Sequence, residues 1–229
     1  MPEDTRLYAL ALCLAVVLLG LVLFLRLHPA REPTSVAPAA GLAAASLPPP
    51  DAEEALIGRV ATVVASRPVR VGCRLTSRLH GNLTELGEAR TVPGSSTSGV
   101  VLLTPSICSN LLSFSHGLDA SDWSCVAQNG PAVCSGAVDA DLLALHTLAH
   151  ETWHVRGIRD EATTDCYALQ SVAVVAQTLG ADAVDANALA TYYAAHFDAI
   201  RRPPPIYRSA GCRDGGALDL HPSLAGWPG

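Results

Sequence analysis

The feature that most constrains this chain is the HETWH motif of residues 150–154, in which two histidines stand four positions apart. Residues with this spacing lie on one face of an α-helix, so both imidazoles can reach one metal ion only if the segment is helical. Its surroundings predict a helix over 139–156, with Asp139 as N-cap and Gly157 just past the end. The helix would carry an apolar stripe of Leu142, Leu145, Ala149 and Trp153.

In such a helix, His150 and His154 are candidate ligands of a zinc ion. Glu151 would lie beside the metal-bound water and act as the catalytic general base. His146, one turn earlier, is expected to pack beside the apolar stripe.

Zinc needs a third protein ligand, and the sequence offers Asp160 and Glu161 as alternatives. In a second helix predicted over 160–179, Glu161 and Asp165 fall on the face that carries the apolar residues, whereas Asp160 points away and suits an N-cap. A carboxylate on a core-facing stripe needs a partner, which a metal or a histidine N–H provides. We therefore favour Glu161 as the ligand, with Asp165 hydrogen-bonded behind the site, and keep Asp160 as the alternative.

A third helix predicted over 185–201 supplies His196 and Tyr193 as candidate donors to a substrate oxyanion. Tyr207, in the tail beyond this helix, is a further candidate.

The segment 140–170 resembles the active-site region of zincin metallopeptidases. HExxHxxGxxD, from His150 to Asp160, is similar to the aspartate variant of the metzincin signature, and ExxxD, from Glu161 to Asp165, resembles that of gluzincins such as thermolysin. Residues 51–229 also resemble a group of membrane-anchored actinobacterial proteins. The resemblance implies a Zn²⁺-dependent peptidase in which Glu151 polarises a metal-bound water that attacks a peptide carbonyl. The alternative is a non-catalytic, zinc-stabilised envelope interaction domain with a zincin-like fold.

Residues 7–25 form an uncharged apolar run of 19 residues. As a helix this run spans about 28 Å, the thickness of a bilayer core. It exceeds the apolar region of a cleaved signal peptide, usually about 7–15 residues, and no small-x-small site follows it. We expect a signal anchor that holds the protein in the membrane after a short tail, 1–6, and before a Pro/Ala-rich linker, 26–50.

Six cysteines lie outside this apolar run: Cys73, Cys108, Cys125, Cys134, Cys166 and Cys212. An even number in a short domain predicts disulfides in an oxidising compartment. The sequence leaves their pairing open, although a bridge between Cys125 and Cys134 would close a turn-rich loop. We therefore expect a single-pass protein of a bacterial plasma membrane, with an extracytoplasmic domain over 51–229.

The order of predicted elements in this domain indicates an α+β fold with a short β-sheet followed by the active-site helices, and the resemblance implies that the domain is zincin-like. The expected fold is therefore a small α+β domain preceded by one N-terminal transmembrane helix. A helix capped by Asp51 precedes strands near 69–75, 86–92 and 100–103, a helix over 106–114, a loop over 115–138 and the three helices named above. The net charge is −6, so the sequence has no cationic footprint for nucleic acid. The expected partner, besides the membrane, is a peptide or protein substrate.

Overall fold

The computed structural model describes residues 47–76, 79–80, 83–84, 86–91, 99–117, 123–127, 134, 136–222 and 227. The chain divides into two units, 1–45 and 46–229, and every described residue belongs to the second.

The structure corrects the predicted membrane anchor. In the described ranges, no helix is both long enough and apolar enough to cross a bilayer. The transmembrane helix that we included in the fold class, and the single-pass plasma-membrane localisation that rested on it, are therefore wrong by this finding. The segments that carried the prediction, 1–6, 7–25 and the linker up to residue 46, lie outside the described residues.

The described part of the chain is an α+β unit in which one helix precedes the strands and the longest helices follow them. The helices are α2 (Ala52–Ala65), α3 (Pro105–His116), α4 (Ser124–Ala127), α5 (Gly136–Val155), α6 (Glu161–Thr178), α7 (Ala183–Ile200) and the 3₁₀ helix η1 (Pro205–Tyr207). The strands are β1 (Val69–Gly72), β2 (Leu79–His80), β3 (Leu83–Thr84), β4 (Gly87–Thr91) and β5 (Gly99–Leu103).

The main sheet has three strands in the order β1-β5-β4. β5 pairs parallel with β1, with Val71 opposite Val101, and antiparallel with β4, with Glu88 opposite Leu102. All three strands were predicted, whereas the two-residue pair β2 and β3 was not. β4 lies at one edge of this sheet, a position that matters for the site below.

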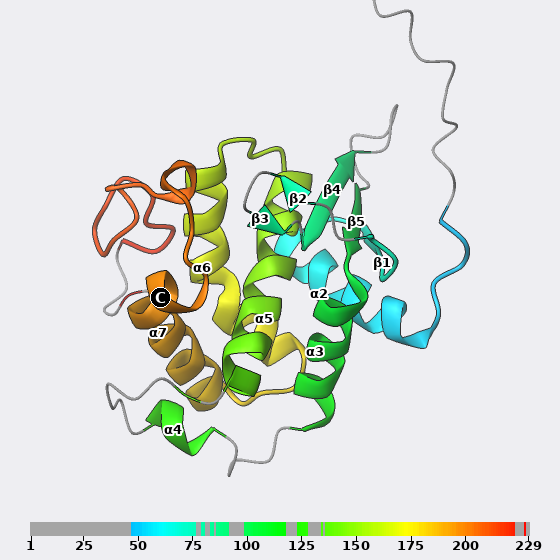
Figure 1. Cartoon of the computed structure of the whole chain (residues 1–229), viewed down its shortest axis with the longest axis horizontal. Coiled ribbons are helices and arrows are strands. Elements are labelled where there is room, and N and C mark those ends of the chain that lie inside the picture. The colour runs from blue at the N-terminus through cyan, green and yellow to red at the C-terminus, as the bar shows by residue number, and fades with distance from the viewer. Residues whose placement is uncertain are drawn as a thin grey trace, which may run out of the picture. The chain divides into compact units, whose positions relative to one another are not determined.

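Helix α5 forms the centre of the unit, with α6 and α7 on one side and α3 and the sheet on the other (Figure 1). Neighbours surround it so completely that 13 of its 20 residues are buried. The predicted apolar stripe is among them, but so are His146, His150 and Glu151. Polar side chains at such positions need partners, because burial without them costs free energy.

The ends of the helices follow their capping residues. Asp160 caps α6 by accepting a hydrogen bond from the backbone N–H of Thr163 at 2.8 Å, as predicted. Helix α5 begins at Gly136, however, so Asp139 lies in its first turn and the predicted N-cap there is wrong. Between α5 and α6, Gly157 adopts φ of +101°, a left-handed conformation that lets the chain turn sharply.

Three disulfides brace the unit, as the cysteine count predicted, and they indicate an oxidising environment. Cys73 is bonded to Cys108 and Cys125 to Cys134. The third bond, between the remaining two cysteines, links α6 to the C-terminal tail across a sequence separation of 46. Gln170 of α6 reinforces this link, since its side chain donates to the carbonyl of Leu218 at 2.9 Å.

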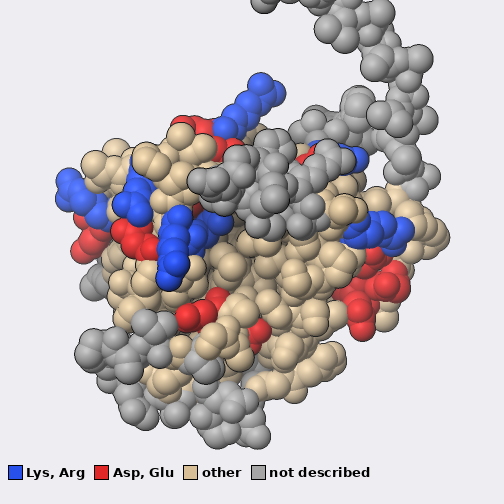
Figure 2. Space-filling view, viewed as in Figure 1, with Lys and Arg blue, Asp and Glu red and all other residues tan. Residues whose placement is uncertain are grey.

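Charged side chains on the described surface in view occur in small groups of both signs, separated by uncharged residues (Figure 2). No extended field of one sign covers the described part of this face.

Candidate metal centre

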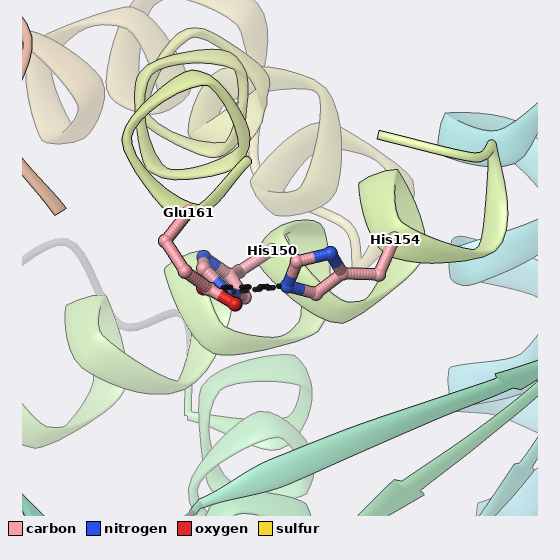
Figure 3. Close-up of side chains that lie close together, drawn as sticks. All are labelled: His150, His154 and Glu161. Carbon is pink, nitrogen blue, oxygen red and sulfur yellow. Dashed lines mark hydrogen bonds and ion pairs between the residues drawn. The ribbon is translucent and has the colours of Figure 1, made fainter. Parts of the chain in front are cut away.

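Three side chains from α5 and α6 converge on one point. The Nε2 atoms of His150 and His154 lie 3.0 Å apart, and Oε2 of Glu161 lies 3.2 Å from the first and 3.5 Å from the second. Figure 3 shows both histidines projecting from α5 and Glu161 reaching them from the first position of α6. This group could hold a metal ion.

The outer nitrogen of each histidine is already engaged. Nδ1 of His150 lies 2.6 Å from Oδ1 of Asp165, and Nδ1 of His154 lies 2.7 Å from the carbonyl oxygen of Ile158. Both partners accept hydrogen bonds, so the network assigns the proton of each imidazole to Nδ1. The lone pair of each Nε2 then points into the space shared with Glu161, which is the arrangement of histidine metal ligands.

Two lone pairs and a carboxylate oxygen within 3.5 Å of one another require a positive charge between them. In the metal-free protein a proton supplies it. Burial alone would lower the pKa of His150, but hydrogen bonds with Asp165 and Glu161 outweigh burial and raise that pKa to about 9. The same imidazoles lower the pKa of Glu161 to about 2. The position that this proton occupies in the metal-free protein is the one where a metal ion could be held.

Asp165 stands behind His150, one turn along α6 from Glu161, as its position on the helix face predicted. It is 2% exposed, and its Oδ2 lies 3.8 Å from Nε of Arg201. Burial would raise its pKa, but His146, His150 and Arg201 together hold the pKa below its usual value. Asp165 is thus ionised and fixes the orientation of His150.

Glu151 is buried, with 7% of its surface exposed, and lines the same pocket as the metal-binding group. Strand β4 approaches it closely at Gly87. A methyl group at this position would lie 2.8 Å from both Cδ and Oε1 of the Glu151 carboxylate. The missing side chain of Gly87 therefore leaves the room in which the carboxylate sits.

The pocket has a volume of about 470 Å³. Residues 86–89 of the β4 region form one wall, α5 and Glu161 form the floor, and three residues from the end of α7 and the tail complete it. Those three are Arg201, Ile206 and Tyr207. Burial raises the pKa of Tyr207, so its hydroxyl remains protonated and able to donate at neutral pH.

The other predicted site residues lie elsewhere. Asp160 uses its carboxylate to cap α6 and is not part of the metal-binding group. His196 stacks on Tyr192, with ring centroids 4.3 Å apart, and its Nδ1 lies 2.9 Å from that residue's carbonyl oxygen. Tyr193 is fully buried against the ring of His146. Of the predicted oxyanion donors, the structure brings Tyr207 alone to the pocket.

Arg201 was not among the predicted site residues, although the sequence contained a signal for it. Arg201 follows Phe197 by four positions and Tyr193 by eight, so it continues the face of α7 that enters the core. A charged residue on such a face is the pattern that singled out Glu161.

Comparison of the chain with family models, with curated proteins and with solved structures gave no match. The site geometry therefore carries the functional argument.

Proposed function

We propose that this protein is a zinc-dependent peptidase. The observation that carries the proposal is the position of Glu151, whose carboxylate is buried at the wall of an open pocket beside two histidines and a glutamate that face one point. This combination supports the zincin arrangement that the HExxH motif predicts.

The distances support zinc as the metal. For bonds of about 2.0–2.1 Å, tetrahedral geometry sets neighbouring ligand atoms about 3.3 Å apart. The three separations in the group are 3.0, 3.2 and 3.5 Å. Two imidazoles and one carboxylate are the donor set of catalytic zinc sites, which keep the fourth position open. In this protein the fourth position would face the pocket.

A bound zinc ion supplies Lewis acidity and lowers the pKa of a water molecule that it binds. Glu151 would accept a proton from the attacking water and pass it to the leaving amine. Tyr207 would donate a hydrogen bond to the carbonyl oxygen as negative charge develops there. Among the described strands β4 pairs only with β5, and an extended peptide would add to its other edge alongside the pocket.

The alternative is a non-catalytic, zinc-stabilised interaction domain. Two observations favour the peptidase. A purely structural zinc site is usually closed by four protein ligands, whereas the group found in the described residues has three. The same group also lines the pocket together with Glu151, a residue that a structural site does not require.

The test compares metal content and hydrolysis among variants of the full chain. Glu151→Gln should keep one zinc per chain by elemental analysis and lose roughly 10²–10⁴-fold in activity on a peptide library. Glu161→Ala should lose the zinc. Asp160→Asn is the matched control, since asparagine also caps a helix, and it should keep both properties.

Full activity in Glu151→Gln would refute the mechanism. One tightly bound zinc without hydrolysis of any peptide by the wild type would favour the interaction domain instead.

A further inference from the structure

Arg201 carries a charge that the proposed chemistry does not use. Among the described residues that line the pocket, it is the one arginine. Its side chain is 17% exposed, and its buried Nε has no hydrogen-bond partner in the described structure. The nearest carboxylate oxygen, Oδ2 of Asp165, is 3.8 Å away, beyond hydrogen-bond distance. The guanidinium therefore balances charge within the protein but donates no hydrogen bond to a described carboxylate.

The position of Arg201 is fixed relative to the metal-binding group. Its Cζ lies 5.1 Å from the ring centre of Tyr207, which lies 5.9 Å from the ring centre of His150. The guanidinium is thus at most about 11 Å from that imidazole. An extended peptide advances about 3.3–3.6 Å per residue, so Arg201 can reach a group within about three residues of a bond held at the metal.

The backbone at Arg201 is held by contacts on both sides of the residue. Arg201 ends α7, and its backbone N–H donates to the carbonyl of Phe197 at 2.9 Å. The tail that follows is held to α6 by the Cys166–Cys212 disulfide. A side chain on a backbone held in this way, with no hydrogen bond to another described side chain, loses less conformational entropy on binding a ligand than one on a mobile loop.

We propose that Arg201 binds a carboxylate of the peptide substrate, so that the pocket selects acidic peptides; this inference rests on the proposed peptidase function. A guanidinium presents its donors as a planar fork that matches the two oxygens of a carboxylate. The carboxylate is either the C-terminus of the peptide or the side chain of an aspartate or glutamate near the cleaved bond.

The test uses the zinc-loaded full chain and three kinds of acetylated six-residue Ala/Gly peptide. One has a free C-terminal carboxylate, one ends in an amide, and one is an amide with a single glutamate, placed in turn at each position. Cleavage is measured as kcat/KM, and binding is measured by calorimetry in the Glu151→Gln background. Arg201→Gln and Arg201→Lys are compared with Arg59→Gln, a change on the exposed surface of α2.

The wild type should prefer one of the acidic peptides over the neutral amide by roughly 10- to 100-fold, the range for charge-assisted hydrogen bonds. The peptide that is preferred identifies the source of the carboxylate. Arg201→Gln should abolish the preference, so that the preferred acidic peptide loses roughly 10- to 100-fold more than the neutral amide, and Arg201→Lys should keep part of the preference. Arg59→Gln should behave as wild type. If Arg201→Gln does not fold, Arg201→Lys tests the proposal instead, and it should lose part of its kcat/KM on the acidic peptide but not on the neutral amide.

An equal loss for all three peptides, or no acidic preference in the wild type, would overturn the proposal and leave Arg201 as a counter-ion of Asp165. The two proposals fail separately. If the wild type cleaves no peptide, the peptidase proposal fails, while calorimetry still shows whether acidic peptides bind through Arg201.

Discussion

Metal affinity should rise steeply between pH 7 and pH 9, because a proton and a metal ion compete for the same ligand atoms. In the metal-free protein, burial opposes protonation of His150, but hydrogen bonds with Asp165 and Glu161 prevail and raise its pKa to about 9. An imidazole binds metal only when it is neutral, so binding near neutrality must displace this proton.

The size of the effect follows from the fraction of neutral imidazole. With a pKa of about 9, that fraction is about 1% at pH 7 and about half at pH 9, so the apparent affinity should increase about 50-fold. A histidine with an ordinary pKa of about 6.5 would give less than a twofold increase. The pKa of His154 is also raised, since its hydrogen bond with Glu161 outweighs burial, and this adds to the slope.

The raised pKa of His150 also makes the stability of the metal-free protein depend on pH. A pKa raised on folding stabilises the metal-free protein fully below about pH 6.5, and that contribution is lost as the pH rises through about 9. The difference between the ordinary histidine pKa of about 6.5 and the pKa of about 9 corresponds to about 3 kcal/mol in the free energy of unfolding. Metal binding therefore restores stability in the pH range where the proton leaves.

The assay is competition with a chelator for zinc at each pH, with calorimetry in two buffers to count released protons. About one proton should leave per zinc at pH 7. Asp165→Asn should flatten the pH dependence and lower the affinity at pH 9 by roughly 10- to 100-fold. Asp182→Asn, a change at the N-cap of α7, is the control. An affinity constant within twofold from pH 7 to pH 9, with no proton release at pH 7, would refute the reasoning.

Three further changes test other parts of the structure. Gly87→Ala places a methyl group against Glu151 and should reduce peptide hydrolysis about 100-fold at unchanged zinc content, measured by kinetics and elemental analysis. Burial lowers the pKa of His146 to about 3, so its contribution to stability is present above pH 6.5 and lost as the pH falls toward 3. When the pH falls from 6.5 to 4, the free energy of unfolding, measured with urea on the metal-free protein, should therefore decrease by about 3 kcal/mol less in His146→Leu than in the wild type. Replacing Cys166 and Cys212 together by alanine should lower the free energy of unfolding by about 4 kcal/mol, the chain-entropy value for a loop with their separation of 46. An unchanged urea midpoint would contradict that value.

The metal-binding group could be predicted because its residues are local and lie on helices with a clear period. The spacing of Glu161 and Asp165 along the apolar face of α6 placed both carboxylates toward α5, where the structure has them. Asp160 had the residue type of a ligand, but its position before the first turn made it a cap. Helical geometry thus separated two neighbouring carboxylates that a motif alone left as alternatives.

Tyr207 was a candidate donor by its residue type, but the path that brings the C-terminal tail to the pocket could not be predicted, because it depends on contacts between distant segments. Tyr207 lies in a Pro/Gly-rich tail without hydrophobic period, so no rule of helix or strand spacing applies to it. Its place depends on the bond between Cys166 and Cys212, and six cysteines do not reveal their pairing. The pairing of Cys125 with Cys134, which closes a local loop, could be anticipated.

The short connection between α5 and α6 explains why the metal-binding group is so compact. The turn at Gly157 brings Glu161 to the histidines, and the carbonyl of Ile158 in the same turn accepts the hydrogen bond that orients His154. One turn further, Asp165 does the same for His150. A longer loop could deliver a carboxylate but would not place the Ile158 carbonyl against the second histidine. The residues that would bind and orient the metal therefore belong to one helical hairpin, whereas β4 and the disulfide-held tail determine what can enter beside it.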